Sequence, residues 1–387
     1  MSLARRYVLV GVGAVLMLVL GLLWVNQAPY SPARRLLRAI DGNSAGFLRA
    51  RKEFLMNSTA DASGVLLEYA ANVRRPASAR QRALAVLRDM AIRQPLPGCG
   101  AALARLLDGQ SPGFKAEVLL TMAALRSFDG AAALVPLITG RTDSVISRGA
   151  TLALVAAVGA MADSVARYAR LGDSLSIDSC VRLLAPMPVG KGVVYPVAAR
   201  FYQRAGDSAR AAAMLRDVGC VDRWWVCGPF PSKRLDGVSR VDPPQVRAFN
   251  PRDTFVVDAE ITARWSPLRG VTPADVIDIR RLFVRELDAS AFFCVDVVAP
   301  SAREALLLCG SDDGIRVWLN DADIWSFRGY RGTVADNDAI RVTLNAGRNR
   351  LLVKVVQDMG AWGMQCRIAD LRGVAMPDVQ YELGSGE

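Results

Sequence analysis

The sequence predicts a multidomain α + β protein. It has a single N-terminal transmembrane helix, an α-helical solenoid-like domain and a C-terminal antiparallel β-sandwich of jelly-roll-like form. Three observations predict this order. An uncharged apolar run opens the chain, apolar residues then recur at steps of three and four, and short apolar or alternating runs between turn residues follow. The 387 residues are enough for two domains after the membrane helix.

The apolar run extends from Tyr7 to Val25 without a charged residue. A helix of this length spans about 28 Å, close to the thickness of a bilayer's hydrocarbon core. Arg5 and Arg6 precede the run, and Trp24 lies near its end, where an indole suits the membrane interface. A cleaved signal peptide is the alternative, but its apolar region is usually shorter, about 7–15 residues, and no clear cleavage site follows. We therefore expect an uncleaved signal anchor.

Basic residues flank the anchor on both sides, with Arg34, Arg35 and Arg38 after it, so the positive-inside rule is nearly tied. A short tail before an anchor most simply stays in the cytoplasm. The expected localisation is therefore the bacterial inner (cytoplasmic) membrane, single-pass, with a cytoplasmic N-terminus and the bulk in the periplasm. The predicted segments are the tail and anchor (1–26), a linker (27–32), the helical repeat domain (33–220), the β-sandwich (221–372) and a C-terminal tail (373–387).

Composition excludes several kinds of chemistry. The net charge is +11, carried mostly by arginine, which indicates either a generally basic surface or attraction to anionic lipids or an acidic partner. No basic run or nucleic-acid-binding motif accompanies it, so nucleic acid is not an expected partner. Histidine is absent, which excludes Ser-His-Asp and Cys-His pairs and histidine metal ligands.

The seven cysteines form no CxxC pair, so zinc-ribbon and thioredoxin-like motifs are missing. Most lie in apolar surroundings and are expected to be buried free thiols. Cys294 and Cys309 flank the turn at 299–303 symmetrically, so a hairpin would place them nearly opposite each other. A cross-strand disulfide between them remains an open alternative.

Residues 33–218 are rich in Ala, Leu and Arg, and the segments 79–94 and 114–128 have helical periodicity. Similar tetrads at 106–109, 137–140 and 169–172 recur at steps of about 31 residues, each expected to end the second helix of a hairpin. The first helices of these hairpins are expected near Ala79, Phe114 and Ile146, and a further hairpin is expected at 193–218. The pattern resembles HEAT-type α-solenoids, with an irregular helical bundle as the alternative.

Near Cys220 alanine thins out and aromatic and β-branched residues increase. Turn residues separate the following runs at short intervals, which favours an antiparallel sandwich. A short helix or ordered excursion is expected at 274–289. Strands are expected at 221–231, 253–261, 291–299, 304–310, 314–320, 339–345, 349–357 and 363–370. Alternation should place Ile315, Val317 and Leu319 on one face, and Trp318 on the other.

The most specific signal is the stretch 310–368. It contains Ser311-Asp312-Asp313-Gly314, then Val317-Trp318-Leu319-Asn320, a turn at 344–349 and a terminal Trp362-Gly363. This pattern resembles the galactose-binding-like and protective-antigen-type β-sandwich modules, which are similar to carbohydrate-binding modules. With an entry strand around 225–230, the resemblance covers roughly 222–372.

The resemblance implies that Asp312 and Asp313 can hold Ca²⁺. No other cofactor is expected. It also implies that aromatic residues stack on sugar rings. The alternative for the two aspartates is a plain turn, and for the tryptophans it is core packing. The candidate ligand-binding residues are Trp318, Asn320, Arg328, Tyr330 and Trp362.

No P-loop, nucleophile elbow or zinc-protease motif is present. The expected function is a non-catalytic, membrane-anchored accessory or scaffold subunit that binds integral membrane subunits of a photosynthetic, respiratory or secretion complex. The alternative is a membrane-tethered glycan-binding protein that uses the sandwich. A carboxylate-dependent enzyme acting on glycosides is a weaker alternative.

Overall fold

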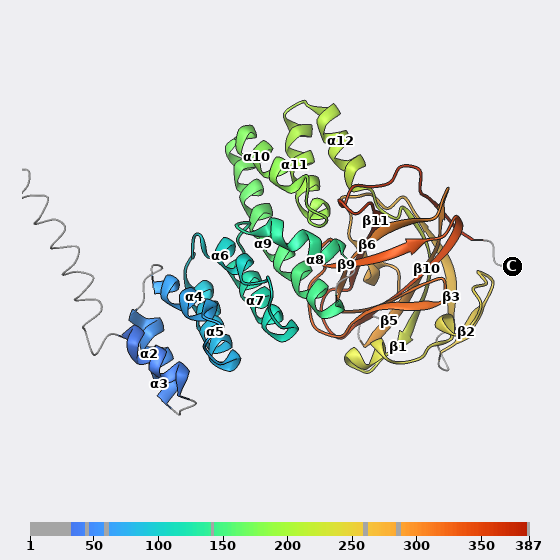
Figure 1. Cartoon of the computed structure of the whole chain (residues 1–387). Helices are drawn as coiled ribbons and strands as arrows, with labels where there is room; N and C mark the ends of the chain where they lie inside the picture. The colour runs from blue at the N-terminus through green and yellow to red at the C-terminus, as the bar shows by residue number, and fades with distance from the viewer. Residues whose placement is uncertain are drawn as a thin grey trace, which may run out of the picture. The chain divides into compact units, whose positions relative to one another are not determined.

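The computed structural model describes residues 32–42, 46–57, 62–140, 143–257, 262–283 and 288–384. These residues form helices up to Val218 and mainly strands from Arg223 onward (Figure 1). They divide into two compact units, Met1–Thr121 and Met122–Glu387, so the predicted boundary near residue 220 lies inside the second unit. The predicted anchor lies outside the described residues. Among those described, only the helix Ser144–Leu171 is long and apolar enough to cross a membrane, and half of its most apolar stretch is buried inside the structure.

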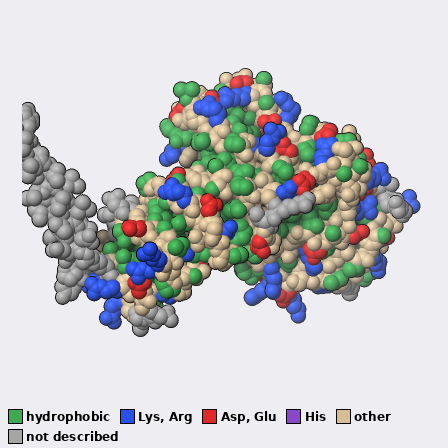
Figure 2. All heavy atoms as spheres, viewed as in Figure 1, with side chains coloured by type: hydrophobic (Ala, Val, Ile, Leu, Met, Phe, Trp, Pro, Cys, Tyr) green, Lys and Arg blue, Asp and Glu red, His purple; other side chains and the backbone are tan. Residues whose placement is uncertain are grey.

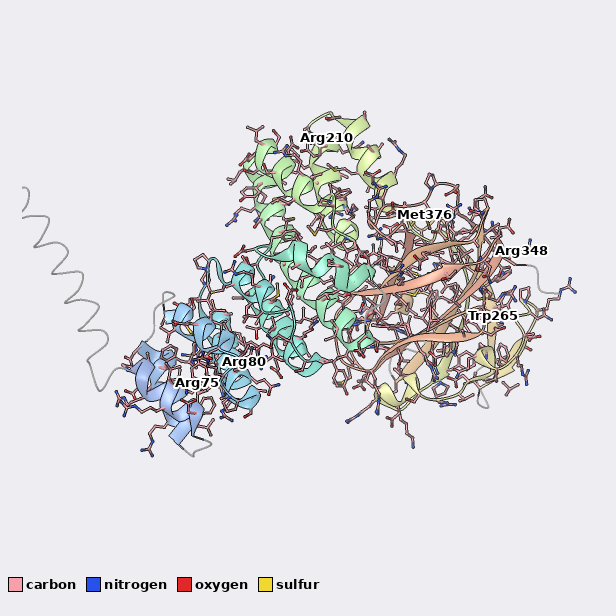
Figure 3. The ribbon with its side chains drawn as sticks, in the orientation of Figure 1. Arg75, Arg80, Arg210, Trp265, Arg348 and Met376 are labelled. Atoms are coloured by element: carbon pink, nitrogen blue, oxygen red, sulfur yellow. The ribbon has the colours of Figure 1, made fainter. Side chains whose placement is uncertain are left out.

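The first unit is built from short helices. They are α2 (Pro32–Asp41), α3 (Gly46–Asn57), α4 (Ser63–Ala71), α5 (Ala77–Arg93), α6 (Cys99–Arg105) and most of α7 (Pro112–Leu125). Arg80, which Figure 3 labels in α5, is buried among them. Its guanidinium donates to the Ala70 carbonyl at 2.6 Å and to Gln110 at 3.1 Å, and it lies 4.0 Å above the ring of Phe114. One arginine thus joins three segments of the unit, because its planar head can donate several hydrogen bonds at once.

The helices of the second unit are α8 (Val135–Thr139), α9 (Ser144–Leu171), α10 (Ser174–Leu184), α11 (Lys191–Arg204) and α12 (Ser208–Val218). Asp143, Asp173 and Asp207 precede three of them and accept N–H groups of their first turns, which explains where those helices begin. The hairpin expected at 193–218 is confirmed as α11 and α12. The hairpin expected to begin at Ile146 is wrong, because α9 continues unbroken to Leu171 and accommodates Gly159.

Two antiparallel sheets follow. Sheet A has the order β2 (Thr254–Val256), β3 (Thr262–Arg269), β1 (Arg223–Pro231), β5 (Ala289–Ala299), β10 (Gly347–Gln357), β7 (Gly314–Leu319) and β8 (Ala322–Phe327), and β12 (Gln380–Glu382) also pairs with β5. Sheet B has the order β4 (Ile277–Asp278), β11 (Gly363–Ala369), β6 (Arg303–Asp312) and β9 (Asp338–Leu344). Most of the expected strands are therefore confirmed. Strands β3, β4, β8 and β12 had not been expected. The short helix or ordered excursion expected at 274–289 corresponds, within the described residues, to β4 and a 3₁₀ turn at Ile279–Arg281.

The two sheets enclose the main hydrophobic core. Ile315, Val317 and Leu319 of β7 point into it, whereas Trp318 belongs to a second apolar cluster on the outer face of sheet A, which confirms the predicted alternation. A segment at 232–249, here called the cover segment, lies over part of that outer face. Lys354 and Asp242 hold it there through a buried ion pair of 2.6 Å. Sheet A is therefore apolar on both faces.

The helices of the second unit pack against sheet B. Figure 1 shows α8 and α9 beside β9. Arg148 of α9 donates to the Ser326 carbonyl at 2.7 Å and lies 4.2 Å above the ring of Trp325. Arg341 of β9 donates to the Thr139 carbonyl at the end of α8. Helices and sandwich therefore share polar contacts across their boundary.

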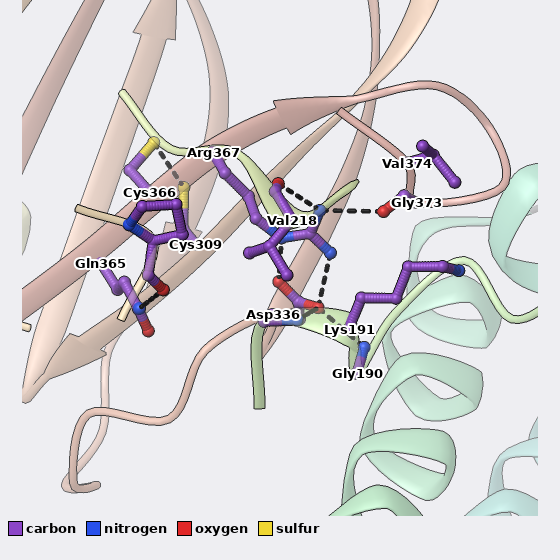
Figure 4. A network of polar contacts seen from close by, with 12 residues as sticks. Gly190, Lys191, Val218, Cys309, Asp336, Gln365, Cys366, Arg367, Gly373 and Val374 are labelled. Carbon is purple, nitrogen blue, oxygen red and sulfur yellow. Dashed lines mark hydrogen bonds and ion pairs between the residues drawn. The ribbon is translucent and has the colours of Figure 1, made fainter. Parts of the chain in front are cut away.

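A buried ionic cluster holds the same boundary further along the chain (Figure 4). We call Gly190, Lys191, Gly192, Asp336 and Arg367 the Asp336 cluster. Arg367 of β11 donates Nε and Nη2 to the two Asp336 oxygens at 2.6 and 2.7 Å. The N–H groups of Gly190 and Gly192 donate to the same carboxylate at 2.7 and 3.2 Å. An added Cβ at Gly192 would lie 2.8 Å from the Asp336 carboxylate, so this approach requires glycine.

Charges within the Asp336 cluster are balanced by their neighbours. Burial alone would raise the pKa of Asp336, but the charge and hydrogen bonds of Arg367 and the glycine N–H groups hold it below its usual range. Lys191 is 1% exposed and donates Nζ to the carbonyls of Met187 at 2.6 Å and Arg372 at 2.7 Å. Burial, and then the charge of Arg367, lower the pKa of Lys191 to about 8. The second unit is consequently one body of helices and sandwich.

The disulfide between Cys294 and Cys309, the open alternative to free thiols, is not formed. Strands β5 and β6 are consecutive but belong to different sheets, so the turn between them crosses the sandwich and does not close a hairpin. Cys294 lies on the outer face of sheet A, whereas Cys309 lies in the core with its sulfur 3.6 Å from that of Cys366. The described cysteines are free thiols.

Candidate functional site

The best-formed concave site is a pocket on the outer face of sheet A, at the edge of the cover segment. Its volume is about 360 Å³. The register of the strands explains its composition, because side chains at even positions of β5, β10 and β7 all point outward there. The lining residues are Pro244, Gln245, Arg247, Ala248, Phe249, Cys294, Asp296, Trp318, Asn320, Asp321, Arg348, Arg350 and Leu352.

A bidentate ion pair forms the polar centre of the pocket. Asp296 and Arg350 are opposite each other on β5 and β10, and Arg350 donates Nε and Nη2 to the carboxylate at 2.9 and 3.2 Å. The guanidinium lies 4.9 Å from the centre of the Phe249 ring. Burial lowers the pKa of Arg350, but the hydrogen bond and charge of Asp296 outweigh it and raise that pKa, so the pair stays ionised. A planar charged group beside an aromatic ring is suited to binding a polar ligand.

Other groups around the pocket are polar, but none is an activated nucleophile. Arg348, labelled on the sandwich in Figure 3, pairs with Glu382 at 3.0 Å. Gln245 has a buried Oε1 that accepts no hydrogen bond within the described residues. Burial raises the pKa of Cys294 to about 12, so its thiol stays protonated and is a poor nucleophile. The arrangement can bind a ligand by hydrogen bonds and ring contacts.

Two of the predicted ligand-binding residues, Trp318 and Asn320, line this pocket. Trp318 is part of the floor and is largely buried. Asn320 sits in the tight turn after β7, where its amide donates to Asn349 at 3.0 Å and accepts the N–H of Arg350 at 2.9 Å. Asn320 and Asp321 both have positive φ, which Asn and Asp tolerate better than most residues. The Asn320 side chain therefore shapes the pocket rim.

The other predicted ligand-binding residues lie elsewhere. Arg328 and Tyr330 line a separate shallow depression, where Arg328 pairs with Asp236. A hydrogen bond from the exposed Tyr330 to Asp358 raises the pKa of Tyr330. Trp362 is buried in the main core against Phe283, so it packs the sandwich. The five residues therefore do not form one site.

The acidic pair lies at the end of β6, with Asp312 as the last residue of the strand and Asp313 directly after it. Asp313 accepts N–H groups of Arg331 and Asp358, each at 3.2 Å. Burial, and then the charge of Asp313, raise the pKa of Asp312 to about 6. Such a pair supplies carboxylate oxygens, but no group of three or more Cys, Asp or Glu is placed to hold a metal within the described ranges.

Other acidic residues close to this pair in the sequence have partners of their own or lie elsewhere. Asp336 binds Arg367, Asp338 binds Arg331, and Asp323 binds Arg316. Asp321 lies at the pocket on the outer face of sheet A. Three of these neighbouring carboxylates are therefore paired with arginines, and no three acidic residues of the described ranges gather at one point.

Sequence reasoning missed Gln245, Phe249, Asp296 and Arg350. Asp296 had one detectable signal, because it is a lone carboxylate at an outward position of the otherwise apolar strand β5. The matching outward arginine on β10 could be assigned only after the two strands were paired. Phe249 and Gln245 lie in an irregular segment, for which periodicity gives no information.

Comparison with known proteins adds little. No protein-family model matches the chain, and no curated protein sequence does either. Among solved structures, the PA14 domain of the antifreeze protein MpAFP is 11% identical with a TM-score of 0.20, and the match covers 24% of this chain and 52% of that one. The chain thus spans about half of that domain structure.

Two further structures show similarly weak likeness. An engineered protein is 14% identical with a TM-score of 0.26, with coverage of 48% of this chain and 96% of that one. A β-glucosidase from Kluyveromyces marxianus is 11% identical with a TM-score of 0.26, with coverage of 42% and 19%. The assignment of a β-sandwich therefore rests on the strand pairing described above.

Proposed function

We propose that the protein is a non-catalytic, membrane-tethered accessory subunit that binds and stabilises partner subunits of a membrane complex. The observation that carries this proposal is the Asp336 cluster, which fixes helices and sandwich into one body. A surface whose parts are already fixed loses less conformational entropy on binding than a mobile one. The proposed function is thus supported by the fixed arrangement of the helices and the sandwich in the second unit, together with the anchor expected from the sequence.

Exposed apolar side chains on the helices of the second unit support a protein-binding role. Leu171 at the end of α9 and Leu175 and Leu183 of α10 are all exposed. Large exposed apolar side chains that gather on one part of a surface mark interaction sites more often than isolated ones do. We place the partner contact at this end of the helical region, with HEAT-like stacking of helix pairs as the architecture that presents it.

Purification from native membranes in mild detergent tests the proposal. We expect stoichiometric membrane subunits to co-purify, and Leu175→Glu with Leu183→Glu to reduce their recovery at least tenfold, since a buried charge is poorly tolerated at an interface. Val256→Glu, at an exposed apolar position on the edge strand β2, is the matched control. Wild-type protein that purifies alone, without membrane subunits, would contradict the proposal.

A second candidate is glycan binding by the sandwich. Phe249, Trp318 and the Asp296–Arg350 pair meet in one pocket, which combines ring surface with planar hydrogen-bonding groups. Binding of the full-length protein on a glycan array, followed by titration calorimetry, tests it. Gln245→Ala should weaken a bound glycan about fivefold to tenfold through one lost hydrogen bond. Gln365→Ala, on β11 of sheet B, should leave binding unchanged.

A further inference from the structure

The net charge of the protein is concentrated in the first unit. Up to Thr121 the chain has 16 Lys and Arg and 7 Asp and Glu, a net charge of +9. From Met122 onward it has 32 and 30, a net charge of +2. Two of the cations of the first unit, Arg5 and Arg6, precede the predicted anchor, so the part of the first unit that follows the anchor carries +7 of the total of +11. A uniformly basic protein would not show this difference.

One surface of the first unit combines cations with exposed apolar side chains. A shallow depression between α3 and α5 is lined by Leu48, Arg51, Lys52, Leu55, Asp89, Ile92 and Arg93. Leu48 is 67% exposed and Ile92 is 77% exposed. The acidic member, Asp89, accepts a hydrogen bond from Arg51 at 2.6 Å, so its charge is already balanced. Green and blue side chains intermingle on this unit in Figure 2.

Helix α3 extends the same surface. Met56 is 70% exposed and lies eight positions after Leu48, with Lys52 midway between them. At about 100° per residue these three side chains fall within one side of the helix, and Arg49 flanks them next to Met56. We call Leu48, Lys52, Met56, Ile92 and Arg93 the α3–α5 face. Large apolar side chains beside Lys and Arg are the composition of helices that lie in a membrane interface.

The sequence keeps this unit close to the predicted anchor. Six residues separate Val25 from Pro32, where α2 begins. Even a fully extended connection would reach only about 25 Å. Helix α2 packs on α3, and Arg35 of α2 pairs with Glu53 of α3. A unit held this near to a bilayer has part of its surface within reach of the lipid headgroups.

We propose that the α3–α5 face rests on an anionic lipid surface, with its apolar side chains among the headgroups and its cations against lipid phosphates. The proposal depends on the membrane tether of the proposed function. Each Lys or Arg near an anionic leaflet strengthens association about fivefold, and the effect is screened by salt. A lipid surface is favoured over an acidic protein because the tether already brings it close.

Hydrogen exchange of the full-length chain in nanodiscs tests this proposal. One set of nanodiscs contains phosphatidylcholine alone, and the other contains phosphatidylglycerol as well. We expect slower exchange in α3 and the end of α5 only with the anionic lipid, and recovery of fast exchange in high salt. Arg49→Glu with Lys52→Glu should reduce the ratio of docked to free protein at least about 25-fold, or fivefold for each cation removed.

Two further variants separate the contributions. Leu48→Ser with Ile92→Ser should weaken docking while keeping its dependence on anionic lipid. Arg200→Glu with Arg204→Glu, two exposed positions of α11 in the second unit, makes the same change of charge at residues that are not part of the face and should leave exchange of α3 unchanged.

Three results would overturn the proposal. Equal exchange in both kinds of nanodisc would show that anionic lipid does not cover the face. Protection that arises only when native membrane subunits are present would assign the face to a protein partner. A chain that fails to enter nanodiscs at all would remove the tether, whereas co-purification of partner subunits would still report separately on the accessory role.

Discussion

The helices of the first unit and those of the second unit have similar Ala-, Leu- and Arg-rich sequences but are held in different ways. In the first unit, the pair of Arg88 and Glu117 joins α5 and α7 while both side chains remain about a quarter exposed. In the second, Asp336 and Arg367 join helices to sandwich with side chains that are 0% and 5% exposed. The residues that make the difference lie in loops and strands, so helix composition does not reveal which helices will bind the sandwich.

The energetic consequences of the two kinds of pair differ. A solvent-exposed ion pair contributes about 0–1 kcal/mol because water and salt screen it. Breaking a buried pair by removing one partner costs about 3–5 kcal/mol, because the remaining charge stays buried without compensation. The second unit should therefore be much more sensitive to loss of a single carboxylate than the first.

Replacement of Asp336 by Ala should produce the largest effect. We expect the unfolding free energy of the second unit to fall by about 3–5 kcal/mol, since the buried Arg367 guanidinium would be left without its carboxylate partner. Urea denaturation followed by circular dichroism measures this change. Glu117→Ala in the first unit is the control and should cost less than about 1 kcal/mol. Equal effects of the two variants would remove the distinction between the units.

Much of the fold could be predicted because local pattern determines it. Residues of β7 alternate between the main core and the outer face of sheet A, as predicted. Ile315, Val317 and Leu319 face the core, and Trp318 faces outward. Strand β3 was missed because its alternation is interrupted by polar residues and Pro267. The break expected within α9 was wrong because a single glycine does not end a helix whose neighbours pack well.

The candidate site and the Asp336 cluster could not be predicted in the same way. Asp296 and Arg350 are 54 residues apart in sequence, and Gly190 and Asp336 are 146 apart. Their proximity depends on strand order and on which loops meet, neither of which leaves a periodic signal. Trp362 shows the opposite kind of error. Its residue type suggested contact with a ligand, but its side chain is buried in the core and cannot reach one.

Asp242→Ala extends the comparison to a second buried pair, within the sandwich itself. Lys354 would be left in the outer apolar layer of sheet A, but unlike arginine it can lose its proton, and burial already lowers its pKa. We therefore expect a smaller loss, about 2–4 kcal/mol, that partly recovers at high pH. Hydrogen exchange should quicken across the cover segment at 232–249. Asp323→Ala, which removes the exposed partner of Arg316, should change neither quantity appreciably.

Lys191→Met tests whether the Asp336 cluster contains a costly buried cation. The pKa of Lys191 is about 8 in the folded protein and near 10.5 when unfolded, so the unfolded chain binds more protons between these values. Stability of the wild type should therefore rise with pH across this window, on the order of 2 kcal/mol, relative to the Met variant. Parallel stability curves for the two proteins from pH 8 to 10.5 would show that Lys191 titrates normally.

The smallest effect is expected at Asp312 and Asp313, where two carboxylates lie at the edge of the sandwich and not between its helices and strands. Asp313→Ala should lower the unfolding free energy by about 1–2 kcal/mol, because the N–H groups of Arg331 and Asp358 lose their acceptor.

Asp312→Asn should instead stabilise the folded protein at neutral pH. The pKa of Asp312 in the wild type is about 6, above the ordinary value near 4. The folded state therefore binds more protons than the unfolded state between pH 4 and 6, and the wild type loses stability as pH rises through that window. The Asn variant lacks this loss, so its melting temperature should exceed that of the wild type at pH 7 and match it near pH 4. Thermal melts at both pH values in a calcium chelator measure this difference directly. Two results together would contradict this expectation: the chelator lowers the melting temperature of the wild type, and the Asn variant is destabilised at pH 7. The pair would then bind calcium, and its negative charge would stabilise the folded state.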